Sequence, residues 1–87
     1  MNTEKADTNE QLTTTTARVS TIVCEIGKFS SIDPTQDFYE AGVTSVAALT
    51  LLMELESAFE VSIPDDQFIG ARTVQRLAEV IVGLANA

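Results

Sequence analysis

A serine hydroxyl at the expected start of a helix is the group in this chain whose setting points to chemistry. Ser45 closes the segment GVTS at 42–45, and an apolar stretch without glycine or proline then runs to about Phe59. Gly42 permits a positive φ angle or a close backbone approach just before the turn. The first turn of a helix has unpaired N–H groups and the positive end of the helix dipole, which favour an exposed anion by roughly 0.3–1 kcal/mol. A phosphodiester on Ser45 would lie in that field.

A purely structural role for the same hydroxyls is the simpler interpretation. Thr44 or Ser45 can act as the N-cap of the helix, where replacement by alanine typically costs about 1 kcal/mol. Caps are common and modified serines are rare, so the hydroxyl alone favours a cap. The sequence around the serine is therefore needed to distinguish a cap from a modification site.

Two separated blocks of sequence, one around Ser45 and one downstream, provide that context. In the first, DFYEAGVTSVAALTLL at 37–52, an acidic and aromatic approach leads to a glycine, two residues, the serine and a helix of spaced aliphatic residues. The second is IPDDQFIGARTV at 63–74. Together they resemble the acyl carrier protein family, the carriers that bear phosphopantetheine, and the resemblance covers about residues 17–84. It implies that Ser45 receives 4′-phosphopantetheine covalently from coenzyme A.

The same resemblance implies a carrier and not an enzyme. The thiol of the arm holds an acyl or aminoacyl group as a thioester, and the protein delivers it between enzymes of a lipid, polyketide or nonribosomal-peptide-type pathway. The implied partners are a phosphopantetheinyl transferase, an acyl- or aminoacyl-activating ligase and a downstream synthase or transferase. The physical advantage is effective concentration, because a tethered intermediate meets successive active sites without being released.

Two positions beside the serine differ from the usual family pattern. Most carriers have Asp, or His in many peptidyl carriers, directly before the serine and Leu directly after it, whereas this chain has Thr44 and Val46. Thr44 can still cap the helix, but it brings no negative charge to a basic transferase surface. These differences keep a second function class open: an unmodified carrier-like helical adaptor that only binds protein partners.

The helix that starts at Ser45 is expected to have a core face and an outer face. The expected core residues are Ala48, Leu51, Leu52, Leu55, Ala58 and Phe59. On the outer face we expect Val46 and Met53 to be at least partly exposed and to form a docking patch, and the alternative is that they widen the core. The candidate partner-binding residues are Thr44, Val46, Thr50, Met53 and Glu54.

Composition limits the remaining function classes. With 87 residues the chain forms one small domain, and a domain this small buries only about 60% of its unfolded surface, which disfavours a deep catalytic cleft. Five basic and thirteen acidic residues give a net charge of −8, which disfavours nucleic acids and anionic membranes and favours basic protein partners. We expect a cytoplasmic monomer, because neither a signal peptide nor an apolar run of membrane-spanning length is visible.

No catalytic residues and no metal ligands are expected. The chain has no histidine, and Cys24 is the only cysteine, so it cannot form an internal disulfide and is expected to be a structural thiol. Asp33, Thr35 and Asp37 alternate like the start of a calcium loop, but the later positions lack the required glycine and glutamate. The acidic residues are therefore interpreted as a solvated surface that faces partners.

The pattern along the chain predicts an all-α fold, an antiparallel four-helix bundle with three main helices and one short helix. Residues 1–12 are expected to be a disordered polar tail and residues 13–87 the carrier domain. The first helix is expected from Ala17, followed by a loop that Ile32 and Phe38 anchor on the core. A short helix after Pro64 is expected to point Phe68 and Ile69 inward, and Thr73 is expected to cap the last helix, whose apolar residues are Val74, Leu77, Ala78, Ile81 and Leu84 or Ala85.

Overall fold

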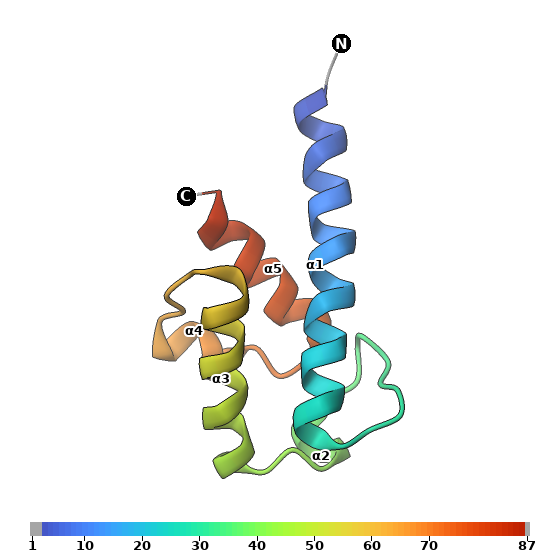
Figure 1. The fold of residues 1–87 in the computed structure, drawn as a ribbon, viewed down its shortest axis with the longest axis vertical. Coiled ribbons are helices and arrows are strands. Elements are labelled where there is room, and N and C mark those ends of the chain that lie inside the picture. Colours follow the sequence, from blue (N-terminus) through green and yellow to red (C-terminus); the bar gives the residue numbers. More distant parts are fainter. Residues whose placement is uncertain (1–2, 87) are drawn as a thin grey trace.

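The structure is a computed structural model, and it describes residues 3–86. Within this range it contains five helices and no strand: α1 (Thr3–Gly27), α2 (Phe38–Ala41), α3 (Ser45–Phe59), α4 (Asp65–Gly70) and α5 (Val74–Ala85). Figure 1 shows α1 and α3 running antiparallel, with α2 at the end where they are connected and α4 beside α3. The expected all-α bundle is confirmed, and α2 is an additional four-residue helix inside the expected loop.

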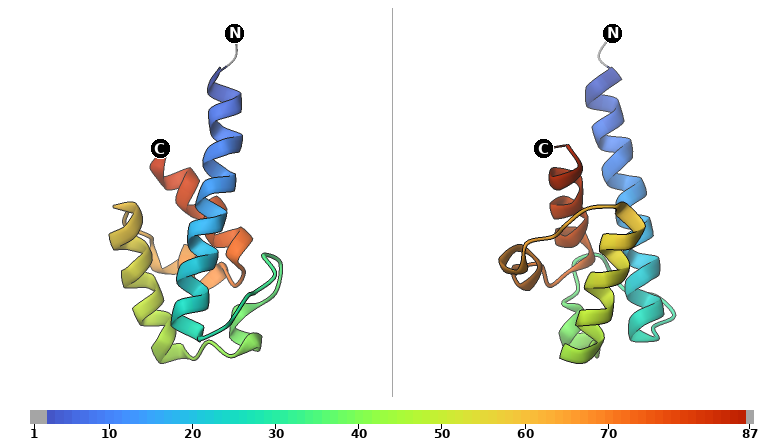
Figure 2. Two further views of the ribbon diagram at one scale, coloured as in Figure 1. Left: turned by 45° about the vertical axis from the view of Figure 1, so that its right-hand side comes forward. Right: turned by 60° about the vertical axis from the view of Figure 1, so that its left-hand side comes forward.

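Helix α1 packs against both α3 and α5, and the two views of Figure 2 show its first turns extending beyond the other helices. It begins at Thr3, well before the start near Ala17 that the periodicity predicts. Threonine is compatible with this longer helix because its hydroxyl can bond back to the preceding turn, as Thr16 Oγ1 does by donating to the carbonyl oxygen of Leu12 at 2.7 Å. Leu12 also packs against the core. The structure thus differs from the disordered tail expected at 1–12, while the boundary of the carrier domain stays a prediction; residues 1, 2 and 87 lie outside the described residues.

The core forms where α1, α3 and α5 meet, and it also includes apolar side chains from α2, α4 and the connecting segments. Its buried members are Val19, Val23, Phe38, Val43, Ala48, Leu51, Leu55, Ile63, Phe68, Ala71, Val74, Leu77, Ala78 and Ile81. Phe38 is fully buried and Ile32 packs against the core, so both anchors expected for the loop are confirmed. Thr73 Oγ1 accepts a hydrogen bond from the N–H of Arg76 at 3.1 Å, which confirms the cap expected for α5.

The expected core face of α3 is mostly confirmed. Ala48, Leu51 and Leu55 are buried, and Leu52 and Phe59 are half-buried against the core. Ala58 is exposed, so the expectation for this residue was wrong. It lies at the edge of the stripe, where Arg18 of α1 covers the helix end instead: its guanidinium donates to the carbonyl oxygen of Ala58 at 3.0 Å and lies 4.3 Å from the centre of the Phe59 ring.

Candidate functional site

Ser45 is the first residue of α3, and its side chain is exposed. The residue before it provides the cap: Thr44 Oγ1 accepts a hydrogen bond from the N–H of Ala47 at 3.1 Å, and the Thr44 carbonyl oxygen accepts one from the N–H of Ala48 at 2.9 Å. The capping role that either hydroxyl could fill is therefore filled by Thr44. The hydroxyl of Ser45 is not needed to hold the helix.

The turn before the serine separates buried from exposed residues. Gly42 ends α2 with a φ angle of 135°, so of the two roles open to this glycine the structure has the positive φ, which other residues rarely adopt. Its N–H donates to the carbonyl oxygen of Phe38 at 3.1 Å, and the N–H of Val43 donates to the same oxygen at 2.9 Å. Val43 is consequently buried, while the next residues, Thr44 and Ser45, face solvent.

An apolar hollow of about 290 Å³ opens beside the serine, between α2, α3 and α4. It is lined by Tyr39, Ser45, Ala48, Leu49, Leu52, Asp65, Phe68 and Ile69. Phe68 is buried as expected, but Ile69 is 68% exposed, so the expectation that it points inward was wrong. Consecutive helical residues point about 100° apart, and the short α4 presents only one side to the core. Ile69 therefore forms part of the rim of the hollow.

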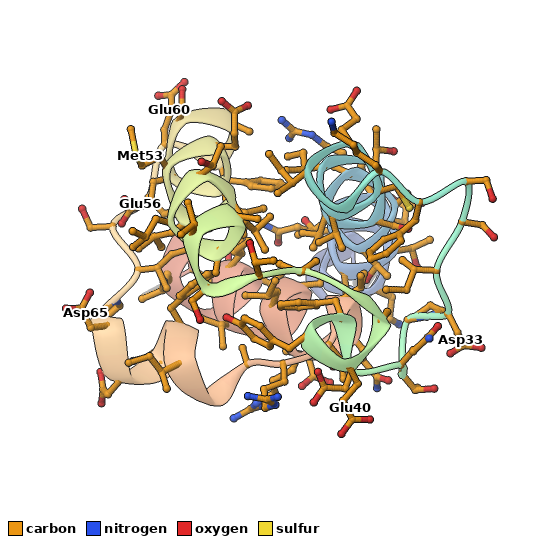
Figure 3. All side chains as sticks on the ribbon, turned by 90° about the horizontal axis from the view of Figure 1, so that it is seen from below. Asp33, Glu40, Met53, Glu56, Glu60 and Asp65 are labelled. Atoms are coloured by element: carbon orange, nitrogen blue, oxygen red, sulfur yellow. The ribbon has the colours of Figure 1, made fainter. Side chains whose placement is uncertain are left out.

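Large apolar side chains are exposed on α3 and α4 around this hollow. Val46, Leu49 and Met53 of α3 and Ile69 of α4 are 76%, 64%, 69% and 68% exposed, and we refer to them as the apolar patch. The exposure expected for Val46 and Met53 is thus confirmed. Figure 3 shows Met53 projecting from α3 on the side away from α1, the side on which Asp65 of α4 also lies. An apolar area of this kind on a small domain is typical of a protein interaction surface.

Leu49 is a member of the patch that the sequence analysis did not single out. It follows Val46 by three positions and precedes Met53 by four, so the three residues share one helical face. This spacing is visible in the sequence and could have identified Leu49. The hollow beside Ser45 depends on α2 and α4 as well, and no spacing within α3 indicates it.

The polar residues of α3 near the patch have different roles. Thr50 and the carboxylate of Glu54 are exposed. Glu56 is half-buried, and its Oε2 accepts a hydrogen bond from the N–H of Ile63 at 2.9 Å, so it holds the connection to α4. Residues 29–71 contain no lysine or arginine. Helix α3 contains two carboxylates, Glu54 and Glu56. Because Glu56 is engaged in this hydrogen bond, Glu54 is the one that is exposed to a partner.

An ion pair between Asp37 and Arg72 lies beside Tyr39, on the α2 side of the hollow. Asp37 caps α2, because its Oδ1 accepts hydrogen bonds from the N–H groups of Tyr39 at 2.8 Å and Glu40 at 3.1 Å. Its Oδ2 accepts a charged hydrogen bond from Nε of Arg72 at 2.6 Å. The guanidinium carbon of Arg72 lies 4.6 Å from the centre of the Tyr39 ring. We refer to these side chains as the Asp37–Arg72–Tyr39 cluster.

The Asp37→Asn variant is expected to lose stability at neutral pH but not in acid. The hydrogen bond from Arg72 lowers the pKa of Asp37 below its ordinary value of 3.8. A lowered pKa in the folded state means that the stabilisation is present above pH 3.8 and is lost as the pH falls through the folded-state pKa. Asparagine keeps the capping oxygen and removes the charge. Urea denaturation of both proteins at neutral and strongly acid pH measures this, and a difference that is independent of pH would contradict the ion pair.

Clusters of metal-ligating side chains and membrane-spanning helices are both absent from the part of the chain that the structure describes. Among the side chains that the structure describes, no three of His, Cys, Asp or Glu gather as metal ligands. None of the helices there combines the length and apolar character needed to cross a bilayer. The site presents the exposed Ser45 hydroxyl beside an apolar hollow.

The residues around Ser45 fit a phosphate ester with an extended organic substituent. The first turn of α3 contains no acidic residue, and its unpaired N–H groups and positive dipole end favour a phosphate on the first residue. The hollow beside the serine provides apolar surface that an attached chain can contact. The opposite face of α3 is packed in the core, so a substituent on Ser45 does not disturb the bundle.

Comparison with known protein families agrees with this chemistry. A family model described as "Phosphopantetheine attachment site" matches residues 17–81. The matched range contains the second part of α1, all of α2, α3 and α4, and most of α5. Domains of this family attach 4′-phosphopantetheine covalently, act as non-catalytic carriers, and interact with phosphopantetheinyl transferases and with enzymes of their pathways. The chain belongs to the phosphopantetheine attachment site family of carrier proteins.

Proposed function

We propose that Ser45 carries the 4′-phosphopantetheine group and that the protein delivers an acyl or aminoacyl cargo between enzymes of a lipid, polyketide or nonribosomal-peptide-type pathway. One observation supports Ser45 above all: its hydroxyl is exposed on the first turn of α3, while Thr44 supplies the cap. A serine that capped the helix itself would lose that bond on modification. Here the modification leaves the cap intact.

Attachment joins the Ser45 oxygen to the phosphorus that links phosphopantetheine to the nucleotide part of coenzyme A. The P–O bond to the nucleotide breaks, adenosine 3′,5′-bisphosphate leaves, and the hydroxyl proton passes to a base. The transferase supplies that base, since the chain contains no histidine. Once bound, the group supplies a thiol that holds cargo as a thioester. The role of this chain is to present the serine and to favour the phosphodiester at the helix start.

The partners are a phosphopantetheinyl transferase, an acyl- or aminoacyl-activating ligase and a downstream synthase or transferase. We propose that they contact the residues beside Ser45 on the outer face of α3: Thr44, Val46, Thr50, Met53 and Glu54, all of which are exposed. To these we add Leu49 and Ile69 of the apolar patch. Most of the exposed area here is apolar, and only Glu54 adds a nearby charge on α3. Partner binding should therefore rest mainly on apolar contacts, and its affinity should change little with ionic strength.

We also propose that the carrier acts as a monomer in the cytoplasm. Its net charge of −8 makes two copies repel each other. Cys24 is its only cysteine and is half-buried, which suits a reducing compartment.

Modification at Ser45 is tested by incubating the protein with coenzyme A and a broad-specificity phosphopantetheinyl transferase, followed by intact mass measurement. The wild-type protein is expected to gain the mass of one phosphopantetheine group, and Ser45→Ala is expected to gain none. The matched control is Ser57→Ala, which removes another exposed serine of the same helix and is expected to be modified like the wild type.

Two results would overturn this assignment. An adduct that persists in Ser45→Ala would place the group on another residue. A wild-type protein that gains no mass under conditions that modify a known carrier would favour the alternative, an unmodified carrier-like adaptor that only binds protein partners.

A further inference from the structure

Tyr39 forms the α2 wall of the hollow beside Ser45, and neighbouring side chains restrain its ring. The guanidinium of Arg72 lies over the ring at 4.6 Å from its centre. The ring of Phe38, which is fully buried, lies 4.8 Å away between centroids. Tyr39 therefore lies close to both a buried core residue and a cation.

Arg72 is itself attached to α2 by two separate bonds. Its Nε donates to Asp37 Oδ2 at 2.6 Å, and its backbone carbonyl oxygen accepts a hydrogen bond from the N–H of Phe38 at 3.0 Å. Asp37 in turn accepts the N–H of Tyr39. The segment between α4 and α5 is thus tied to the start of α2 through both backbone and side chain. Arg72 is half-exposed, and its side chain is oriented by these contacts and not by burial.

The remaining lining of the hollow selects against charged and bulky groups. Most of it is apolar and comes from α3 and α4, and the one charged group is the carboxylate of Asp65. The nearby cation, Arg72, is already paired with Asp37, so a second anion placed in the hollow would be repelled by the carboxylate of Asp65. The volume of about 290 Å³ is at the lower end of the roughly 300–1,000 Å³ found for small-molecule sites, which suits a short chain.

We propose that Arg72 is a positioning residue: together with Asp37 it fixes the Tyr39 ring as a wall of the hollow, and this wall restricts the hollow to short, uncharged apolar acyl cargo carried at Ser45. The cargo part of the proposal rests on the proposed attachment at Ser45. The positioning of Tyr39 by Arg72 does not depend on it.

The positioning of Tyr39 can be measured in the unmodified protein. Tyr39 is the only tyrosine and the chain has no tryptophan, so the near-ultraviolet absorbance of tyrosinate reports this ring alone. Burial is the main cause that raises the pKa of Tyr39 above its ordinary value of 10.0, the charge of Asp37 adds to it, and the charge of Arg72 opposes it. Besides Arg72, the charged groups of the surrounding segments are the carboxylates of Asp37, Glu40 and Asp65, and all three are present in the wild type and in an Arg72 variant alike.

The direction of the pKa change in Arg72→Gln separates two cases. If Arg72 positions the ring, the variant lets Tyr39 turn toward solvent, and the pKa falls toward 10.0 because burial is lost. If the ring keeps its place without Arg72, loss of the cation raises the pKa further, and the proposal is overturned.

Arg76→Gln is the matched control, since Arg76 pairs with Glu79 on the surface of α5, and the Tyr39 titration in this variant should equal that of the wild type. Arg72→Lys provides a second variant should Arg72→Gln fail to fold: lysine lacks the guanidinium that bridges carboxylate and ring, so a fall in pKa is again expected.

The restriction on cargo is tested in protein that has been modified with hexanoyl- or succinyl-phosphopantetheine from the corresponding coenzyme A thioesters. Hexanoyl is expected to change the Tyr39 fluorescence relative to the free-thiol form, and succinyl is expected to leave it unchanged. Arg72→Gln should lose the hexanoyl response, and Arg76→Gln should keep it. The cargo restriction is overturned if the Tyr39 fluorescence of the wild-type protein does not change with hexanoyl, or changes equally with succinyl, while the mass measurement shows attachment. Failure of attachment itself is seen separately, as the absence of any mass gain.

Discussion

Replacing Phe38 with alanine is expected to lower the free energy of unfolding by about 3–5 kcal/mol, the range typical of buried aromatic residues. Phe38 is fully buried, and its backbone joins three parts of the site: its N–H donates to Arg72, and its carbonyl oxygen accepts from Gly42 and Val43. The total free energy of unfolding of a small domain is roughly 5–15 kcal/mol. The variant should therefore be partly unfolded at room temperature or unfold at much lower urea concentration, as followed by far-ultraviolet circular dichroism.

Phe59→Ala provides the comparison. The sequence pattern places Phe59 in the core of α3 and predicts a similarly large cost for its truncation, but in the structure this ring is half-buried and covered on one side by Arg18. Its loss should cost clearly less than that of Phe38, because less apolar surface returns to water. Equal losses for the two variants would show that Phe38 is not the dominant aromatic of the core.

Replacing Leu49 with serine is expected to lower kcat/KM of the phosphopantetheinyl transferase for this carrier by about tenfold or more. Burial of a leucine side chain against a partner is worth about 1.5–3 kcal/mol, and about 1.4 kcal/mol corresponds to tenfold. Leu49 lies between Val46 and Met53 in the apolar patch and is 64% exposed, so its replacement should change stability by no more than about 0.5 kcal/mol. Steady-state kinetics with coenzyme A as donor measure this without any cargo.

The matched control for Leu49→Ser is Ala58→Ser. Ala58 is also exposed on α3, but it lies near the far end of the helix, beside Arg18. Its variant should be modified at the wild-type rate. If Leu49→Ser is modified at the wild-type rate as well, Leu49 does not contribute to the transferase interface, and the apolar patch must be reassigned to other partners.

The parts of the site that were predictable from the sequence are those with short-range causes. Gly42 permits a positive φ angle or a close backbone approach, and an angle of 135° is observed. Thr44 and Ser45 indicate a helix start because hydroxyls cap helices, and α3 does begin at Ser45. The spacing of apolar residues also predicted most of the core face of this helix. In each case the cause lies within a few residues of the feature.

The parts that were missed or mistaken depend on contacts between distant segments. Asp37 and Arg72 are 35 positions apart, and only the packing of α2 against the segment before α5 brings them together. Leu12, in the part of α1 that precedes Ala17, packs against the core, and a polar N-terminal composition does not reveal this contact. Ile69 is as hydrophobic as its neighbour, and only the orientation of the short α4 decides that Phe68 is buried and Ile69 is not.

The measurement that tests the central claim most directly is the position of the phosphopantetheine group in the modified protein. Trypsin cleaves after Lys28 and Arg72 and releases residues 29–72 as one peptide, which contains Ser30, Ser31, Ser45, Ser57 and Ser62. Fragmentation of this peptide by tandem mass spectrometry identifies the modified residue. We predict that every fragment carrying the added mass includes Ser45 and that no fragment without Ser45 carries it. Added mass on any fragment that lacks Ser45 would contradict the account.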